Sequence, residues 1–367
     1  MEFIDIDGSY GEGGGSILRQ ACGLSAITGK AIRITKIRDG RCNPGMQEQH
    51  LQAVKAVARL CNAETKGLEL GSKELEFIPG KITKKQLKVE IKTAGSVGLV
   101  IQALLLPCFF SKHNIQVRVK GGGSFGKWSP NLLYFENVLF PVLKKIGLEV
   151  KMVINKHGMY PEGGADVIFN FKPCKQIGNL DLNEQGELLM IKGISIASDD
   201  LRKGKVAERQ SDSARRILGE HFLCPIKVPA QYVSCANTGS AIVLWAEFEN
   251  CILGWDALGE KNEYSEKVGE EAAVGLLKQV ISKSTVDEYL SDQILPFLCF
   301  AKEDSCFRVI KVSGHLMTNM WLLKKFVDVD FEVNDKLIKI KPKSYIVTKG
   351  SYLTQKNYFF FLAGLSQ

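Results

Sequence analysis

A nine-residue pattern that reads as a strand followed by a turn occurs three times in this chain. Its copies are IRITKIRDG at 32–40, IQVRVKGGG at 115–123 and FRVIKVSGH at 307–315. In each copy, apolar residues alternate with polar ones or follow one another until a glycine is reached. This pattern is typical of a strand that ends in a tight turn. A small-residue or apolar helix is expected before each copy, at 16–28, 96–110 and 289–301. One supersecondary unit has therefore been used three times.

The spacing of the copies predicts an inserted domain. The third copy starts much farther from the second than the second does from the first. The extra chain has its own predicted strands at 187–196, 225–234 and 241–249 and helices at 205–218 and 265–283. We therefore expect an α+β core of three repeats formed by residues 1–184 and 283–345. Residues 185–282 would form a smaller inserted α/β domain before the third repeat, and residues 346–367 a C-terminal tail packed against the body.

The composition indicates a globular protein of a reducing compartment. The chain has 367 residues, 45% of them hydrophobic, which is enough for two domains. Its ten cysteines include no CxxC pair, and several lie in apolar helical segments, so we expect reduced, buried thiols. Neither a signal peptide nor a membrane span is expected, because the longest apolar stretch, 97–110, contains Gln102 and Pro107. These features predict a cytoplasmic protein. The formal net charge of +8 permits a polyanionic partner without requiring one.

A glycine-rich segment surrounds Glu12 and leads into a predicted helix that carries Arg19: GSYGEGGGSILRQ at 8–20. The backbone N–H groups of such a loop and the positive end of the helix dipole favour an anion. No Gly-Lys-Ser/Thr closes the segment and it lacks GxGxxG, so it is neither a P-loop nor a dinucleotide fingerprint. The glycines alone are explained equally well by a structural turn. Glu12 favours a site, because a carboxylate and a phosphate can share a divalent cation.

Two arginines, Arg38 and Arg41, flank Gly40 after the first repeated strand, and Gln49 and His50 follow at the start of a predicted helix. Paired guanidinium groups can bind phosphate oxygens in a bidentate manner. The alternative is a pair of exposed surface charges. Equivalent turns of a pseudosymmetric repeat tend to face the same cleft, so we expect these arginines to line it.

The third copy of the pattern ends on His315, where the first two copies have Gly40 and Gly123. A repeat that needed only a turn would keep glycine at this position, so the imidazole is a candidate functional group. The alternative is a structural or surface histidine. A neutral imidazole can act as a nucleophile, a general base or a metal ligand. Metal binding is disfavoured, because no second His or Cys stands at ligand spacing.

The segment DEYLSDQILP at 287–296 gathers Glu288, Tyr289, Asp292 and Gln293 at the start of a predicted helix. Carboxylates interact favourably with the helix dipole there, so capping alone explains the acidic residues. The functional interpretation is a nucleoside pocket, in which Tyr289 stacks on a base and the acids bind ribose hydroxyls.

Together these segments resemble the RNA 3′-terminal phosphate cyclase family over residues 5–331. The resemblance is carried by GEGGGSILR, IRDGRCNPGMQEQHLQAVKA, GLELGSKELEFIPG, TAGSVGLVIQALL, YPEGGADV, GWDALGEKNEYSEKVGEEAA, YLSDQILP and HLMTN. It implies three βαβαββ units around a pseudo-threefold axis with a smaller inserted α/β domain. Within the insert, ANTGSAIVLWAEFE is more similar to archaeal members than to bacterial ones.

The resemblance also implies a reaction: the ATP-dependent conversion of an RNA 3′-terminal phosphate into a 2′,3′-cyclic phosphate, with Mg²⁺ or Mn²⁺. A histidine is adenylated by ATP, AMP passes to the RNA 3′-phosphate, and the ribose 2′-OH displaces AMP. By position, His315 is the nucleophile and Glu12 a metal contact. The residues matched to ATP are Gln102, Pro130, Glu288, Tyr289, Leu290, Ser291, Asp292 and Gln293. Those matched to the ATP phosphates or the RNA 3′-phosphate end are Arg19, Arg38, Arg41 and Gln49.

Two other functions fit the same fold. One is a non-catalytic RNA-binding scaffold of ribosome biogenesis, a branch of the family that lacks the nucleophilic histidine. The other is a different transferase, such as an enolpyruvyl transferase, which lacks the histidine motif. The intact HLMTN argues against the first, and GEGGG, the loop arginines and YLSDQ argue against the second. The sequence leaves the oligomeric state open.

Overall fold

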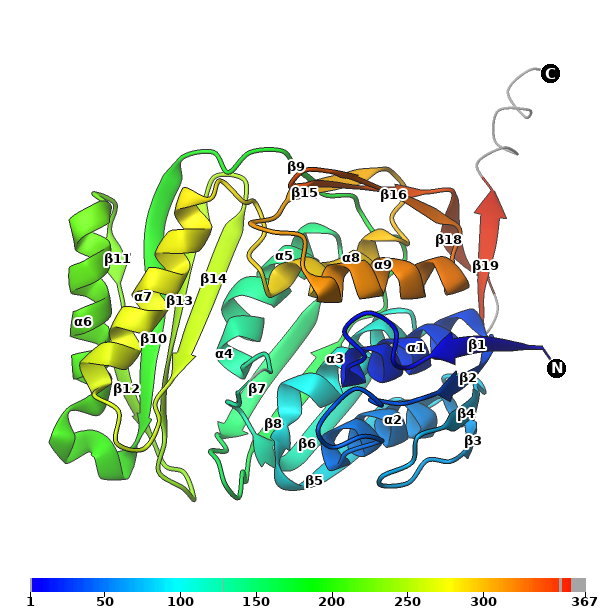
Figure 1. Cartoon of the computed structure of the whole chain (residues 1–367), viewed down its shortest axis with the longest axis horizontal. Coiled ribbons are helices and arrows are strands. Elements are labelled where there is room, and N and C mark those ends of the chain that lie inside the picture. The colour runs from blue at the N-terminus through cyan, green and yellow to red at the C-terminus, as the bar shows by residue number, and fades with distance from the viewer. Residues whose placement is uncertain (1, 128, 350–351, 358–367) are drawn as a thin grey trace.

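The chain begins with a unit of four strands and two helices (Figure 1). The computed structural model describes residues 2–127, 129–349 and 352–357. The elements of the first unit are β1 (Phe3–Asp7), α1 (Gly15–Thr28), β2 (Ala31–Thr35), α2 (Glu48–Cys61), β3 (Glu64–Lys66) and β4 (Leu75–Ile78). Its sheet has the order β1-β2-β4-β3, in which β1 and β2 are parallel and the other pairs antiparallel.

The second unit repeats this connectivity. Its elements are β5 (Gln86–Ser96), α3 (Val97–Phe109), β6 (Ile115–Gly123), α4 (Leu132–Tyr134), the π-helical turn η1 (Phe135–Leu139), α5 (Phe140–Lys145), β7 (Val150–Lys156) and β8 (Asp166–Phe171). The sheet order is β5-β6-β8-β7, again with one parallel pair, β5 and β6, followed by antiparallel pairs.

The third unit has the same order but is split in the sequence. Its elements are β9 (Asp181–Leu182), α8 (Leu290–Leu298), β15 (Ser305–Arg308), α9 (Gly314–Phe326), β16 (Val329–Asn334) and β17 (Leu337–Pro342). Strand β9 pairs in parallel with β15, and β17 lies between β15 and β16. The inserted chain therefore follows the first strand of this unit. A threefold axis relating the units stays a prediction.

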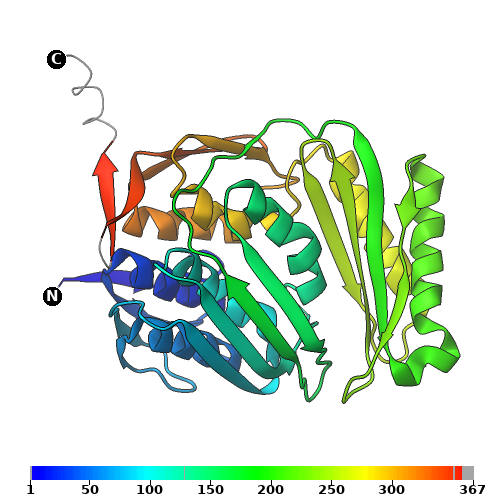
Figure 2. The ribbon, with the colours of Figure 1, turned by 180° about the vertical axis from the view of Figure 1, so that it is seen from behind.

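The inserted chain forms its own five-stranded sheet at one end of the molecule (Figures 1 and 2). Its elements are β10 (Leu188–Ser198), the 3₁₀ turn η2 (Asp199–Gly204), α6 (Val206–His221), β11 (Ile226–Lys227), β12 (Ala230–Val233), β13 (Ser240–Phe248), β14 (Ile252–Leu258) and α7 (Ser265–Ile281). The strand predicted at 225–234 is two short strands, because Pro229 between them has no N–H to donate. Strand β14 was not predicted.

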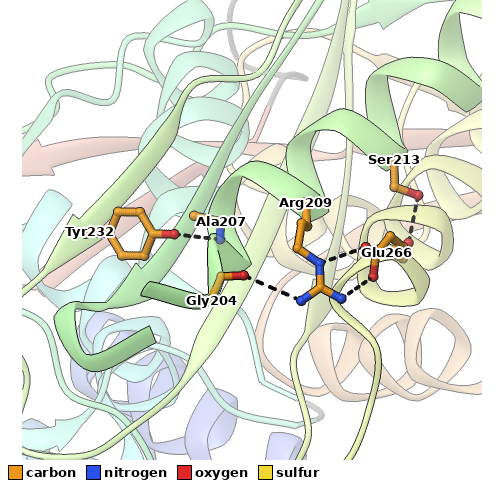
Figure 3. A network of polar contacts seen from close by, with 6 residues as sticks. All are labelled: Gly204, Ala207, Arg209, Ser213, Tyr232 and Glu266. Carbon is orange, nitrogen blue, oxygen red and sulfur yellow. Dashed lines mark hydrogen bonds and ion pairs between the residues drawn. The ribbon is translucent and has the colours of Figure 1, made fainter. Parts of the chain in front are cut away.

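Helices α6 and α7 are joined by a bidentate ion pair (Figure 3). Arg209 donates from Nε and Nη2 to the carboxylate of Glu266, at 2.7 Å each, and Ser213 donates to the Glu266 carbonyl at 2.7 Å. In the same first turn of α6, the Ala207 N–H donates to the Tyr232 hydroxyl. The two helices approach closely at Gly269, where a Cβ would lie 2.1 Å from the carbonyl oxygen of Gln210.

The core is continuous and runs between the sheets and their helices. Helix α3 is apolar on all sides, and every residue in it is buried except the partly exposed Gln102. All ten cysteines are free, and Cys22, Cys108 and Cys299 are buried as predicted. None of the helices in the described part of the chain has the length and apolar character that crossing a bilayer requires.

The C-terminal tail begins with a hairpin of β18 (Ser344–Lys349) and β19 (Tyr352–Asn357). The rest of the predicted tail, 358–367, lies outside the described residues, as do 350–351. The prediction that the tail packs against the body therefore stays a prediction, as do the domain boundaries at 184 and 282.

Candidate active site

The glycine-rich loop between β1 and α1 lies against the first turns of α9. The Glu12 N–H donates to Thr318 Oγ1 at 3.2 Å, and that hydroxyl donates to the Gly314 carbonyl at 2.7 Å. A Cβ on Gly314 would lie 2.3 Å from Glu12 Oε1, so the carboxylate sits directly over the start of the helix. The first and third units thus bring Glu12 to Gly314, the residue that precedes His315.

His315 lies in the first turn of α9 and is exposed. The prediction that it lies on a turn was wrong, because Ser313 caps the helix: its hydroxyl accepts a hydrogen bond from the Leu316 N–H at 3.1 Å. Within the described part of the chain the imidazole takes part in no hydrogen bond or ion pair. Its nitrogens are therefore free to react with a substrate.

Arg41 connects the second loop of the first unit to Glu12. Its Nη2 donates to the Glu12 carbonyl at 2.7 Å and lies 3.5 Å from the Glu12 carboxylate. Arg38 instead donates from Nη1 to the carbonyls of Asn43 and Gly45, at 2.6 and 2.9 Å. Burial and the neighbouring Arg41 lower the pKa of Arg38. Only Arg41 of the two therefore reaches the loop that carries Glu12.

Arg19 and Asp292 are opposite charges between α1 and α8. Burial lowers the pKa of Arg19 to about 10, and Asp292 opposes that shift. Burial likewise raises the pKa of Asp292 to about 7, against the effect of Arg19. The two groups are close enough for each to shift the pKa of the other. The Arg19 side chain nevertheless has no hydrogen-bond partner in the described chain. Its guanidinium N–H groups therefore remain available to an anion.

A cavity of about 50 Å³ with both polar and apolar lining lies where α1, α3 and α8 meet, with room for about one or two water molecules. Gln102 donates to Gln293 at 3.0 Å, and Gln293 donates to the Tyr289 carbonyl at 2.6 Å. Two buried atoms that line the cavity, Ser16 Oγ and Gln20 Oε1, lack a hydrogen-bond partner in the described chain. Unpartnered buried polar atoms indicate a water or ligand group that completes the site.

His50 is a site residue to which sequence reasoning assigned no role. It is buried at the start of α2, and its Nδ1 accepts a hydrogen bond from the Gln47 N–H at 3.3 Å. Burial, Arg19 and Arg38 lower its pKa to about 3, so it is neutral near pH 7. A Cβ on Gly15 would lie 2.0 Å from its Nε2, which explains the glycine where α1 begins. The neighbouring Gln49 lies beside Gly95 and makes no hydrogen bond in the described chain.

Tyr289 lies where the insert meets the second and third units, and it is 38% exposed. Its ring contacts Tyr134 edge to face, at 6.2 Å between centroids, and Trp255 at 4.7 Å with the planes inclined by 31°. Beside it, Glu288 pairs with Lys311 at 2.7 Å. Trp255 was not predicted as a site residue, although it belongs to the motif GWDALGEKNEYSEKVGEEAA.

Asp287, also not predicted, holds this region together. Its buried carboxylate accepts hydrogen bonds from the Tyr134 hydroxyl and from the N–H groups of Gly254, Tyr289 and Leu290, at 2.7 to 3.0 Å. Burial raises its pKa to about 6, although these bonds oppose the shift. Its place just before a helix was the signal that could have identified a cap.

The remaining predicted site residues, Leu290, Ser291 and Pro130, differ in exposure and in the groups that they contact. Leu290 is fully buried, and Ser291 donates from its hydroxyl to the Glu288 carbonyl at 3.3 Å, so both side chains serve the helix itself. Pro130 is partly exposed, and its carbonyl lies against Gly98 at the start of α3. It precedes Asn131, whose side chain accepts from the Tyr134 N–H at 2.7 Å. Pro130 therefore lies four residues before Tyr134, whose ring contacts Tyr289, but outside the helix that carries Tyr134.

Comparisons with known proteins identify relatives over most of the chain. A family model described as RNA 3′-terminal phosphate cyclase matches residues 10–333. The chain is 41% identical over 337 residues to the RNA 3′-terminal phosphate cyclase of Thermococcus gammatolerans, spanning 92% of this chain and 96% of that protein. It is 42% identical over 333 residues to the protein of that name from Pyrococcus furiosus, spanning 90% and 95%.

A third relative of the same name, from Saccharolobus islandicus, is 43% identical over 338 residues, spanning 91% of this chain and 97% of that protein. The matched residues run from the glycine-rich loop through the second unit and the insert to β16 of the third unit. The chain belongs to the RNA 3′-terminal phosphate cyclase family.

Proposed function

We propose that this chain uses ATP to convert RNA 3′-terminal phosphates into 2′,3′-cyclic phosphates, with His315 as the nucleophile. The observation that carries the proposal is that His315 is exposed and its imidazole has no hydrogen-bond partner in the described chain, while Glu12, held by Arg41, lies over the preceding residue, Gly314. The name shared by the similar proteins supports the reaction. A ribosome-biogenesis scaffold would not need this imidazole.

The reaction divides into three displacements at phosphorus. An imidazole nitrogen of His315 attacks the α-phosphorus of ATP, a P–N bond forms, and the bond to pyrophosphate breaks. An oxygen of the RNA 3′-phosphate then attacks the same phosphorus, and the P–N bond breaks. Finally the ribose 2′-OH loses its proton and attacks the 3′-phosphorus, which expels AMP and closes the ring. Adenylation turns a poor leaving group into a good one, which is the purpose of a covalent nucleophile.

Glu12 is the proposed metal contact. Within the described residues no three His, Cys, Asp or Glu side chains gather into a metal-binding group. One carboxylate suits Mg²⁺ or Mn²⁺, because Mg²⁺ typically keeps several waters and takes its remaining ligands from substrate phosphates. Such an ion would neutralise charge that develops on the phosphoryl oxygens.

The ATP pocket is proposed to extend from this loop to Tyr289. Arg19, buried and without a hydrogen-bond partner, suits a phosphate, and Tyr289 presents a partly exposed ring for adenine. Gln102 and Gln293 already form a connected pair between them. The three sheets of equal order support the further proposal that the units surround a pseudo-threefold axis, with residues 185–282 as a separate domain.

Intact-mass measurement after incubation with ATP and Mg²⁺ or Mn²⁺ tests the function. The parent should gain the mass of one AMP, and His315→Ala should not, since loss of a nucleophile can slow a reaction by about 10⁶. His221→Ala, which removes an exposed histidine at the end of α6, is the matched control and should be adenylated like the parent. Equal labelling of His315→Ala and the parent would assign the nucleophile to another residue. A parent that binds 3′-phosphorylated RNA without ever being adenylated would support the scaffold instead.

A further inference from the structure

Tyr10 and Trp321 form an aromatic stack that the proposed chemistry does not use. Their ring centroids are 4.0 Å apart and their planes differ by 10°. Tyr10 is nevertheless 44% exposed, so much of the ring that Trp321 does not cover faces solvent. A flat ring held rigidly in this way is a ready surface for another planar group.

Both residues of the stack belong to segments that also form the candidate active site. Tyr10 belongs to the loop that carries Glu12, and a Cβ on the intervening Gly11 would lie 2.3 Å from Thr318 Oγ1. Trp321 follows His315 by six residues of α9, a distance of about 9 Å along the helix axis. A stacked strand covers that distance with about three nucleotides.

One lysine side chain lies over the stack, and its neighbour in α9 is also a lysine. Lys325 Nζ lies 5.0 Å from the centroid of the Trp321 ring and donates to the Asp5 carbonyl at 3.3 Å. Lys324 lies over the ring of Phe331, at 5.7 Å. Neither ammonium group pairs with a carboxylate in the described part of the chain.

A surface groove of about 430 Å³ continues from these lysines and is also lined by Lys30, which donates to the Phe326 carbonyl at 2.8 Å. The two carboxylates of the groove, Asp328 and Asp330, both pair with Lys343. On the strand side, Asp5 and Asp7 pair with Arg33 and Lys36. The carboxylates near the stack are thus already occupied by other cations.

We propose that Tyr10, backed by Trp321, is a stacking platform for a nucleobase of single-stranded RNA whose 3′-phosphate end lies at His315. This inference rests on the proposed function. Aromatic faces combined with a positively charged path are the usual means of holding single-stranded nucleic acid, and they tolerate any base. Such a platform would bind RNA ends with little dependence on their sequence.

The binding test uses the full chain and a short 5′-fluorescein-labelled oligoribonucleotide that ends in a 3′-phosphate. Tyr10→Leu keeps apolar cover over Trp321 but removes the aromatic face. Fluorescence anisotropy should show a Kd about 5- to 150-fold higher than that of the parent, the loss of one base stack. Tyr10→Phe keeps the ring, and Tyr264→Leu removes an exposed tyrosine at the start of α7, so both should bind within roughly twofold of the parent.

Adenylation by ATP in the absence of RNA separates a platform from a structural clamp. Tyr10→Leu should be adenylated at nearly the rate of the parent, because this step needs no RNA. A Tyr10→Leu variant that binds the oligonucleotide as tightly as the parent would overturn the proposal. So would a parallel loss of adenylation, since the stack would then merely hold the Glu12 loop on α9.

Oligonucleotides with one abasic site near the 3′ end identify the stacked base. An abasic site at the position of the stacked base should weaken binding to the parent. The same abasic site should not change the affinity of Tyr10→Leu, which has already lost this stacking contact. Equal losses for both proteins at every position would place all stacking elsewhere and reject the platform. If the parent is not adenylated yet binding still depends on Tyr10, the platform stands and the cyclase reaction fails.

Discussion

At the scale of single residues, Arg38 and Arg41 show how two similar side chains of one loop differ. Arg38 has a left-handed backbone, with φ of 55°, and its guanidinium donates to carbonyls of its own loop. Arg41 reaches across to the carbonyl and carboxylate of Glu12. The first arginine shapes its loop, whereas the second positions a candidate catalytic group.

Replacement of each arginine should therefore have a different effect. Arg41→Ala should slow adenylation roughly tenfold or more, because Glu12 loses its orientation, while stability changes by only about 0.5 kcal/mol. Arg38→Ala should lower stability by about 1 to 3 kcal/mol, because two carbonyls lose their donor. Single-turnover adenylation and urea unfolding measure these effects.

Arg41→Lys serves as the control that retains the charge without the planar guanidinium. If Arg41→Lys is adenylated at a rate between those of Arg41→Ala and the parent, the loss relative to the parent is due to the missing planar guanidinium and not to the charge. An Arg41→Ala protein that is adenylated at the parent's rate would contradict a positioning role.

At the scale of elements, the contact between α6 and α7 depends more on shape than on charge. The Arg209–Glu266 pair is bidentate, but its side chains are 41% and 53% exposed, so its contribution to stability is small. Gly269 instead faces the backbone of Gln210, which cannot move aside as a flexible side chain could.

Gly269→Ala should destabilise the protein by about 1 to 3 kcal/mol, because the added Cβ forces the helices apart. Gly219→Ala on α6 is the matched control: nothing lies within 4 Å of its added Cβ, and alanine favours the helix by about 0.5 to 1 kcal/mol. Urea unfolding of both variants measures the difference. A gain in stability for Gly269→Ala like that of Gly219→Ala would show that the helix contact adjusts without cost.

At the scale of the whole molecule, the junction between units and insert buries carboxyl groups. Burial raises the pKa of Asp256 and of Asp287 to about 6, and of Asp292 to about 7. The folded state therefore holds these protons more tightly than the unfolded state, and stability falls as pH rises from about 4 to 7. His50 and His157 act oppositely, because burial lowers their pKa values to about 3 and 4.

Comparison with Asp292→Asn isolates one of these groups, since both proteins share the others. The stability of Asp292→Asn relative to the parent should increase by about 2 kcal/mol between about pH 5 and pH 8. The sign follows because ionised Asp292 is disfavoured in the fold and asparagine cannot ionise. Urea unfolding at the two pH values measures the change. A relative stability that stays constant or falls with pH would contradict it.

Much of the fold was predictable, because periodicity and turn residues are local. The helices expected at 16–28, 205–218 and 265–283 agree with α1, α6 and α7 to within a few residues. Strand β14 was missed, because its residues carry a family motif and little alternation. The position of His315 at the front of α9 was missed as well, although Ser313 stands where a cap residue belongs.

The sequence alone determined the repeated pattern, the presence of extra chain before its third copy and the histidine at the end of that copy, because each can be read from the order and spacing of residues along the chain. The sequence placed the insert before the third repeat, whereas the structure shows that the first strand of that unit, β9, precedes it. Only the tertiary structure decided that Glu12 lies over Gly314, that Arg41 rather than Arg38 holds it, and that Tyr10 stacks on Trp321. Those contacts join residues about 30 to more than 300 positions apart. Their geometry depends on how whole units pack, which no local pattern of side chains records.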